Sequence, residues 1–493
     1  MAVSAVMTCR LPARGKGTHD RMTSRNTAAA DAAVRPDGRW LVLTAVSLGL
    51  LLATLDTSIL YIAVPPLTVD LGASTSESLW IINTYPLVMT GLLLGTGTLG
   101  ERYGHKRVFQ YGIVLFGVAS LVAAFSPSPG VLIFARGLLA VGAALMLPAT
   151  LAIIRVTFGD EKERNFAIAV WSSVSIGGIA FGPLVGGLLL EWFWWGSVFL
   201  INVPIVIATF VLTGLYAPKA QELGAVPWDL LSSLLALAGL TGMVAAIKEV
   251  TLPDASAVLL VGAILVSAVS FTLFARRQAR LKTPLLDFRI FSNRGVSAGV
   301  VAAGLSTFVF AGVGAVTSQH FQTAEGYSPL HSGLLVGCIA VGATVTSLLS
   351  GSLLSRIGPR PMLLGGAGLA AVGYAAGALV LPVNLGAFAI TLVTAGAGIG
   401  VLITVASSTI ITNVSPERAG MASGVEEVAY EFGSLLSVTI LGSAYASVAL
   451  TPLGTESSYR TILLMGVTAA VLGFISIALL LPSRASAVAG NGH

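Results

Sequence analysis

Five charged side chains lie inside long apolar stretches of this 493-residue chain. Asp56 lies in LLATLDTSILYIAVPPL and Arg136 in VLIFARGLLAVGAALMLPATL. A charge at the centre of a membrane-spanning helix costs at least ~2.5–3.5 kcal/mol, so such residues usually face a water-filled cavity and move protons or ions. Asp56 is therefore a candidate proton carrier and cation ligand, and Arg136 is its natural counter-charge. The alternative is that Asp56 is only a structural partner for Arg136.

The other three charges are Glu426, Glu427 and Glu431 in MASGVEEVAYEFGSLLSV. Glu427 and Glu431 are four residues apart and share one face of a helix, whereas Glu426 points about 100° away. Glu427 and Glu431 are candidates for the same proton and cation site as Asp56. The alternative is that Glu426 and Glu427 are solvated charges near the cytoplasmic end. Three aromatic residues are candidates for cation–π surfaces in that cavity, unless they face lipid: Tyr85, Trp171 and Tyr430.

The elements that position these residues are long apolar runs. Apolar residues make up 55% of the chain and charged residues 10%, against roughly 25% charged in soluble proteins. Fourteen runs are long enough to cross about 30 Å of hydrocarbon as helices. They predict an all-α membrane protein with transmembrane helices at 41–64, 79–98, 108–125, 130–154, 165–189, 196–216, 229–249, 255–275, 295–318, 330–354, 361–381, 384–412, 420–447 and 461–482.

The chain also repeats itself at an offset of 254 residues. GTLGERYGHKR at 97–107 matches GSLLSRIGPRP at 351–361, and the same offset carries Glu163-Arg164 onto Glu417-Arg418. Duplicated membrane bundles are most often transporters. The offset predicts two bundles of six helices, related by a pseudo-twofold axis, with two extra helices between them. The predicted parts are a disordered cytoplasmic tail (1–38), an N-terminal six-helix bundle (40–218), two extra helices and a basic cytoplasmic linker (219–293), a C-terminal six-helix bundle (294–483) and a second tail (484–493).

The basic residues predict the orientation. With an even number of spans, 24 of the 27 lysines and arginines fall on the side that holds both termini. Basic residues favour the cytoplasm, so both termini are expected there. The net charge of +5 then reflects topology and not nucleic-acid binding. The arginine-rich stretch at 276–294 is interpreted as a linker resting on anionic lipid headgroups, and the alternative is a cytoplasmic switch.

Several classes of function lack their motifs. There is no Walker loop, no HExxH and no GxSxG, and neither Cys9 nor Cys338 has metal-ligand spacing. The segment at 95–100 fits GxGxxG, but no strand precedes it. We therefore expect no enzyme activity, no catalytic residues, no metal and no cofactor, with a proton gradient as the energy source.

Four stretches resemble a known family. GTLGERYGHKR is similar to the loop 2–3 signature of the major facilitator superfamily, and GGIAFGPLVGG (177–187) resembles the fifth-helix motif of its drug:proton antiporters. LDTSILYIAVP (55–65) resembles the first-helix motif of the fourteen-helix drug-exporter branch. WWGSVFLINVP (194–204) is similar to exporters of quaternary ammonium compounds and methyl viologen in that branch. The resemblance covers about residues 40–483 and implies the major facilitator fold.

The resemblance also implies roles for residues. Asp56 would be the first-helix proton and cation site, and Arg136 the fourth-helix arginine of the proton-coupling motif. Gly182 and Pro183, with Gly186, would form a close-packed hinge between the halves. A cytoplasmic gate would contain Gly97, Glu101, Arg102, Gly104 and Arg107. Within this loop the side chains of Arg102, Lys106 and Arg107 can reach Glu101. The alternative is that the basic residues of the loop only set the membrane topology.

Two positions depart from the family pattern. Leu139 and Ala140 stand where relatives usually have Gln and Gly, and Asn83 stands where the second helix usually carries Asp. Losing that carboxylate weakens the case for dicationic substrates, which the glutamates Glu427 and Glu431 would compensate. Asn83 is kept as a candidate substrate-binding residue.

The resulting hypothesis is a proton-coupled multidrug efflux antiporter for lipophilic, mostly cationic compounds. We expect it to act as a monomer in the bacterial cytoplasmic membrane, with small molecules, protons and membrane lipids as partners and no nucleic acid. The alternative is an exporter of a specific endogenous metabolite or antibiotic, or a facilitator of a neutral solute, on the same fold. A non-transporting sensor would need a cytoplasmic domain, for which the polar tails are too short.

Overall fold

The computed structural model describes residues 38–218, 229–251, 255–281, 284–380, 384–414, 419–449 and 454–481. The predicted tails, including Cys9, and the repeat copy at Glu417-Arg418 lie outside the described residues. Within them, every regular element is helical. The elements are α2 (Arg39–Leu71), α3 (Thr75–Tyr103), α4 (His105–Ala124), α5 (Pro129–Thr157), α6 (Glu161–Trp192), α7 (Ser197–Leu200), α8 (Asn202–Tyr216), α9 (Leu230–Val250), α10 (Ala257–Arg280), the 3₁₀ helix η2 (Phe288–Ser292), α11 (Arg294–Thr323), α12 (Pro329–Ile357), α13 (Pro359–Val380), α14 (Leu385–Thr412), α15 (Ala419–Ala449) and α16 (Gly454–Leu480).

Each of the fourteen predicted runs coincides with a helix. In the described part of the chain, thirteen helices are long and apolar enough to cross a membrane, with 197–216 forming one span. The fourteenth is α3, which bends by 55° between Leu93 and Gly95. The GxGxxG segment lies within this helix, so the strand that a dinucleotide site requires is absent there.

The duplication predicted from the sequence is visible in the helix bounds. Adding 254 to both bounds of α3 gives both bounds of α12. The repeated glycines Gly104 and Gly358 end these two helices with φ of +88° and +89°. Residues with a side chain rarely adopt such angles, which explains why both copies of the motif have glycine there.

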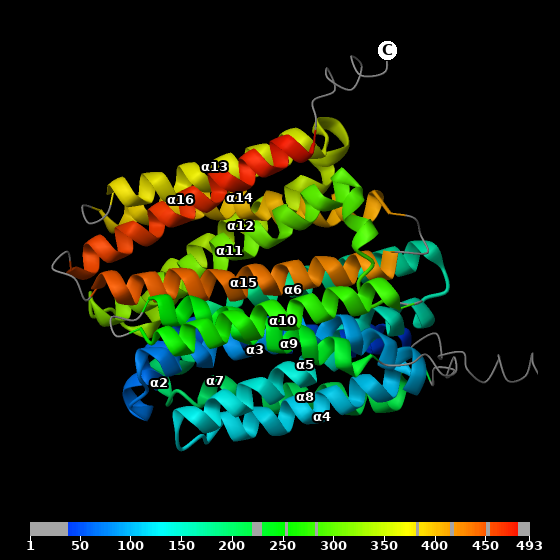
Figure 1. The fold of residues 1–493 in the computed structure, drawn as a ribbon. Coiled ribbons are helices and arrows are strands. Elements are labelled where there is room, and N and C mark those ends of the chain that lie inside the picture. Colours follow the sequence, from blue (N-terminus) through cyan, green and yellow to red (C-terminus); the bar gives the residue numbers. More distant parts are fainter. Residues whose placement is uncertain are drawn as a thin grey trace, which may run out of the picture.

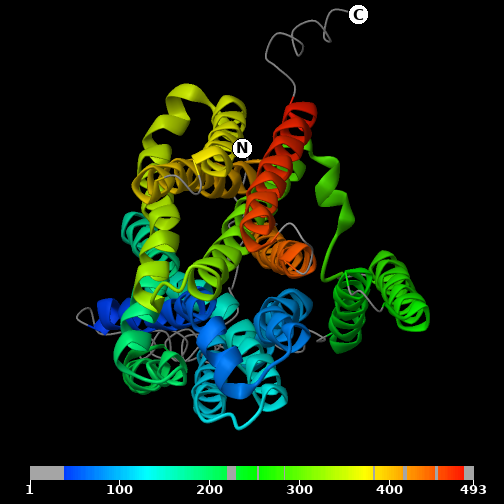
Figure 2. The ribbon, with the colours of Figure 1, turned by 90° about the vertical axis from the view of Figure 1, so that its left-hand side faces the viewer.

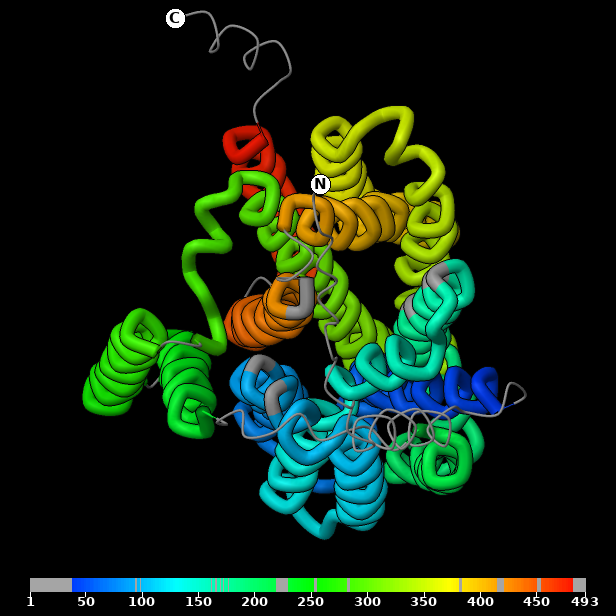
Figure 3. The backbone as a smooth tube through the Cα atoms, turned by 90° about the vertical axis from the view of Figure 1, so that its right-hand side faces the viewer, coloured from blue at the N-terminus to red at the C-terminus, as the bar shows by residue number. Residues whose placement is uncertain are grey.

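The helices form two bundles, α2–α8 and α11–α16, joined by the pair α9–α10 (Figure 1). Each bundle has its own apolar core, and the first core also includes Ala311, Ala315 and Val438 from the second bundle. We call the end at which α2 begins the inner end and the opposite end the outer end. Figure 2 views the molecule along its helices from the outer end, and Figure 3 views it from the inner end.

Prolines within the helices free backbone carbonyls, which other helices then satisfy. Pro148 has no N–H for the carbonyl of Ala144, and the hydroxyl of Thr96 donates to that carbonyl at 2.6 Å. In a bilayer an unsatisfied carbonyl costs several kcal/mol, so a proline in a spanning helix needs such a partner.

Small residues on α6 set its packing against two neighbours. A side chain at Gly178 or Gly182 would collide with Thr54 or Ser58 of α2, so this face brings the two helices into close contact. Gly187, on another face, lies against the backbone of Leu330 in α12. Near the inner end a groove of about 400 Å³ is lined by residues of α2 and α6. Its walls are Trp40, Leu43, Thr44, Ser47, Leu48, Leu51, Phe166, Val170 and Val174.

This packing refines the predicted hinge. Gly182 and Gly186 contact Ser58 and Ile59 within their own bundle. The contact between the bundles is made by Gly187 and by Pro183, whose carbonyl lies against Gly333.

The extra pair α9–α10 packs beside the seam between the bundles, next to α3 and α15 (Figures 2 and 3). Arg277 Nη2 lies 2.9 Å from Asp229 Oδ1 and ties the linker end of α10 to the start of α9. Burial raises the pKa of Asp229, but hydrogen bonds from Arg277 and Ser232 outweigh it and hold that pKa below its ordinary value. At the outer end Lys248 donates to the carbonyl of Ser76 at 2.7 Å.

Candidate proton and substrate site

The centre of the N-terminal bundle holds the ion pair expected from the sequence. Arg136 Nη1 bonds Asp56 Oδ2, and the two side chains are 1% and 0% exposed. Arg136 Nε also donates to the carbonyl of Ile81 at 3.2 Å, and its guanidinium lies 4.7 Å from the ring centroid of Tyr85. These contacts fix the arginine between α2, α3 and α5. The pair is therefore a preorganised charged site in a region of low dielectric constant.

Asn202, at the start of α8, also contacts this pair and was missed in the sequence analysis. Its Nδ2 donates to Asp56 Oδ1 at 3.3 Å and to Ser120 Oγ at 3.2 Å, and the side chain is fully buried. Asn202 therefore orients the second oxygen of the carboxylate. The available signal was a lone amide in the apolar string WWGSVFLINVP.

Glu431 brings a second carboxylate to the site from the other bundle. Glu431, on α15, lies within electrostatic reach of Arg136 and of Glu427, one turn away. Its Oε2 atom is buried and has no hydrogen-bond partner among the described residues. Arg136 thus binds Asp56 and is also within electrostatic reach of Glu431, whose Oε2 atom remains available. A carboxylate with one buried and unpaired oxygen is a site where a proton or a cation is stabilised.

Glu426 points into its own bundle. It is 8% exposed and accepts a hydrogen bond from the Tyr430 hydroxyl at 3.0 Å. The alternative that Glu426 is a solvated charge is therefore wrong. Glu427 is half-buried and lies within electrostatic reach of Glu426.

The three candidate aromatic residues do not form one surface. Tyr85 is 1% exposed, and the cation at its ring is Arg136. Trp171 packs against the first core and Tyr430 against the second. Asn83 is fully buried and donates to Thr439 Oγ1 at 2.9 Å, so it ties α3 to α15 across the interface.

The loop residues predicted as a gate lie at the inner end, where α3 ends and α4 begins. The part of α3 that contacts Arg136, at Ile81 and Tyr85, lies several turns earlier in that helix. Glu101, Arg102 and Arg107 are exposed, and Glu101 lies within electrostatic reach of His105. Lys106 does not follow the expectation that it reaches Glu101. Its amine donates instead to the carbonyls of Gly214 and Ala217 at 2.9 and 2.8 Å, where it caps the end of α8. Gly97 is half-buried.

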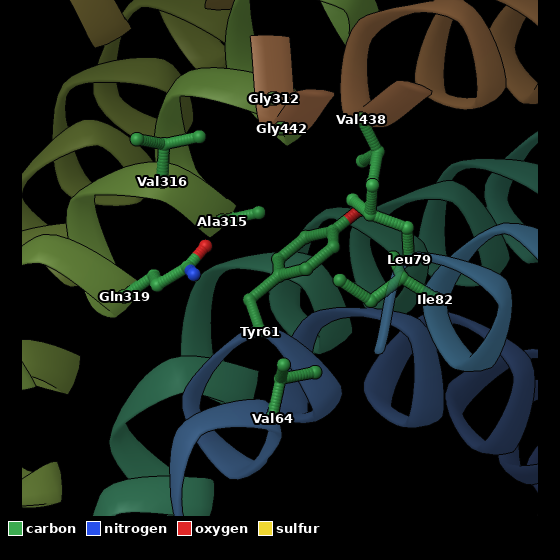
Figure 4. Close-up of a pocket in the computed structure, with 10 residues that line it drawn as sticks. All are labelled: Tyr61, Val64, Leu79, Ile82, Gly312, Ala315, Val316, Gln319, Val438 and Gly442. Atoms are coloured by element: carbon green, nitrogen blue, oxygen red, sulfur yellow. The ribbon is translucent and has the colours of Figure 1, made fainter. Parts of the chain in front are cut away.

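On the outer side of the cluster the bundles meet closely. The cavity left between them measures only about 10 Å³ (Figure 4). It is lined by Tyr61, Val64, Leu79, Ile82, Gly312, Ala315, Val316, Gln319, Val438 and Gly442. A cavity of this size holds about one water molecule. At this cavity the bundles leave no room for a small organic molecule, and we call this region the closed outer end.

Comparison with known proteins agrees with this architecture. The model of the Major Facilitator Superfamily matches residues 46–438. The methyl viologen resistance protein SmvA of Salmonella typhimurium is 37% identical over 435 residues, which cover 85% of this chain and 86% of SmvA. The multidrug efflux pump LfrA of Mycolicibacterium smegmatis is 36% identical and covers 84% of this chain and 82% of its own length. The puromycin resistance protein pur8 of Streptomyces alboniger is 31% identical, with 92% and 93% covered.

A solved structure shares the fold. The human organic anion transporter MFSD10 (TETRAN) superimposes with a TM-score of 0.60 over 90% of this chain and 100% of its own, at 16% identity. The two bundles, the extra pair and the buried site define a multi-pass membrane transporter of the fourteen-helix type. The chain belongs to the major facilitator superfamily.

Proposed function

We propose that this protein is a proton-coupled multidrug efflux antiporter, which exports lipophilic and mostly cationic compounds while protons enter the cell. The observation that carries the proposal is that Arg136 binds the buried Asp56 of its own bundle and also lies within electrostatic reach of Glu431 of the other, whose Oε2 atom is buried without a hydrogen-bond partner among the described residues. The relatives named for methyl viologen resistance, multidrug efflux and puromycin resistance support the same class of cargo.

The exchange follows from the charges. Asp56 is paired with Arg136, so the acids that would take a proton or a substrate cation are Glu431, whose Oε2 atom has no hydrogen-bond partner among the described residues, and its neighbour Glu427. Both ligands are positive, so binding of one favours release of the other. Each elementary charge that crosses a potential of ~100 mV contributes about 2.3 kcal/mol. Proton influx can therefore drive export of a cation against its gradient.

Coupling to motion follows from the location of the acids. Because Asp56 and Glu431 belong to different bundles, protonation of Glu431 weakens its attraction to Arg136 across the interface. A ligand shifts a conformational equilibrium by its difference in affinity for the two states. Loading with protons and loading with cargo thus favour different arrangements of the bundles, as alternating access requires.

The setting is the bacterial cytoplasmic membrane, with the inner end and both termini in the cytoplasm, as the basic residues indicate. The closed outer end then belongs to the form that loads cargo from the cytoplasm. The protein acts as a monomer without a cofactor, is driven by the proton gradient, and catalyses no covalent chemistry.

The test is transport of ethidium into inverted membrane vesicles energised by respiration. Wild-type protein should accumulate the dye, and a protonophore should abolish accumulation. Glu431→Gln should reduce proton-dependent uptake at least ~10-fold, since removal of a charge-assisted interaction is worth about 1.5–3 kcal/mol. Glu456→Gln is the matched control, because Glu456 is 51% exposed at the start of α16. Vesicles that accumulate no cationic compound in a proton-dependent manner would refute the proposal.

The alternative, export of a specific metabolite or antibiotic or facilitation of a neutral solute, retains one observation in its favour. Asn83 replaces an expected acid and is engaged with Thr439, so it adds no charge to the site. Asp56→Asn distinguishes the two functions. Transport of a neutral solute should survive this substitution, whereas proton-coupled export of a cation should not.

A further inference from the structure

One backbone carbonyl at the interface of the bundles cannot be satisfied by its own helix. Ile62 lies in α2 just before two consecutive prolines, Pro65 and Pro66. A helical carbonyl accepts from the N–H four residues on, or three residues on in a tighter turn. Both of those residues are prolines, which have no N–H. Since Ile62 is fully buried, its carbonyl needs a donor from another part of the protein.

The donor comes from the opposite bundle. Gln322, on α11, donates from Nε2 to the carbonyl of Ile62 at 3.0 Å. The same nitrogen donates to Ser318 Oγ, one turn earlier on α11, at 2.8 Å. Both amide hydrogens of Gln322 are thus used, and the side chain is held in one orientation. The bond links the two bundles through the one carbonyl that the proline pair deprives of both helical donors.

The surroundings place this bond in the closed outer end. Tyr61, next to Ile62, has its hydroxyl 3.5 Å from Ser434 Oγ of α15. Its ring lines the cavity of about 10 Å³, with Gln319 of α11 on the opposite wall (Figure 4). These contacts join residues of different bundles. All of them must separate if the outer end opens.

We infer that Gln322 is a gating residue that holds the outer end closed by capping the carbonyl of Ile62. The inference rests on the proposed function, because a transporter that alternates must open this end. In the open form water reaches the carbonyl, so that form does not need Gln322. In the closed form the carbonyl is buried and depends on it. Gln322 therefore sets the ratio of closed to open forms and does not bind the proton or the cargo.

The first test measures that ratio directly. Spin labels at Val69 and Leu379, which are 82% and 83% exposed near the outer ends of α2 and α13, report the separation of the bundles in protein lacking Cys9 and Cys338. Gln322→Ala and Gln322→Met should raise the ratio of open to closed forms about five- to tenfold, the effect of losing one hydrogen bond to a buried carbonyl. The methionine variant keeps most of the volume, so it separates the bond from packing.

Gln319→Ala is the matched control, because Gln319 has the same side chain one turn earlier on α11 and lines the cavity without this bond. It should leave the ratio within about twofold of wild type, well below the effect of one lost hydrogen bond. An unchanged ratio in both Gln322 variants would overturn the inference.

The second test uses the prolines. Pro66→Ala supplies the missing N–H four residues after Ile62, so the carbonyl no longer depends on Gln322. In that background Gln322→Ala should change the ratio by less than about twofold, since the hydrogen bond is then redundant. An equal shift with and without Pro66 would show that Gln322 acts by another route. The distances between the spin labels are measured without cargo and without a proton gradient. The result of this test is therefore independent of whether the wild-type protein transports ethidium.

Discussion

The strongest prediction tests whether the ion pair between Asp56 and Arg136 takes part in transport or only stabilises the fold. It compares Asp56→Asn with the double variant Asp56→Asn/Arg136→Gln. Removing one partner of a buried ion pair costs about 3–5 kcal/mol, because the other charge stays buried without compensation. Arg136 keeps its bond to Ile81 and its contact with Tyr85 in the single variant. We therefore expect a loss near ~3 kcal/mol, the lower end of that range.

The double variant should recover most of this loss, because no charge is left without a partner. Replacing a whole buried ion pair by neutral groups is often close to neutral for stability. Both free energies are read from denaturant unfolding of purified protein in detergent, followed by tryptophan fluorescence. Ethidium uptake into inverted vesicles is measured on the same variants.

Transport should not recover with stability. If Arg136, held by Asp56, is the charge to which Glu431 responds when it takes a proton or cargo, the double variant is stable and proton-dependent uptake stays at least ~10-fold below wild type. If the double variant is stable and transports as wild type does, the pair only holds α2 against α5, and the mechanism proposed for the site is refuted. A single variant as stable as wild type would show that Glu431 already neutralises Arg136.

Three further predictions concern single residues. Asn202→Leu removes a hydrogen-bond donor to Asp56 and should lower the free energy of unfolding by about 1.5–3 kcal/mol. It should also displace the pH profile of dye uptake, and an unchanged profile would show that Asn202 has only a structural role. Gly358→Ala should cost ~1–2 kcal/mol because its φ is +89°, whereas Gly365→Ala, in open helical space, should be neutral or stabilising by chemical unfolding. Gly182→Ala, whose methyl group would collide with α2, should cost ~1–3 kcal/mol, and equal stability would disprove the close contact.

The scaffold could be predicted from sequence because its signals are local. Run length identified every spanning helix, and a fixed offset identified the duplication. The glycine in both copies of the repeated loop follows from a backbone angle that only glycine adopts easily. Asp56 and Arg136 could be paired because a charge in an apolar run needs a partner.

The partners that come from distant segments could not be predicted in this way. Asn202 and Asp56 are 146 positions apart in the sequence. The pattern of apolar residues in either segment does not indicate that the two side chains meet. Lys106 was expected to contact Glu101 because the two are close in sequence, but its amine donates to the carbonyls of Gly214 and Ala217 at the end of α8, 108 and 111 positions away. Glu426 is a different case, because its hydrogen-bond partner Tyr430 lies only four residues further along the same helix and is half-buried.

The duplication also shows where the charges were added to a symmetric scaffold. The offset of 254 carries Asp56 onto Phe310 and carries Glu431 back onto Gly177. Each half thus has its acid where the other half has an uncharged residue. Two carboxylates at equivalent positions would be related by the pseudo-twofold axis and would take protons alike. Because Asp56 has Arg136 beside it and Glu431 has no bonded partner on Oε2, the two acids differ in their surroundings, and the arginine that binds one acid is also within electrostatic reach of the acid of the other bundle.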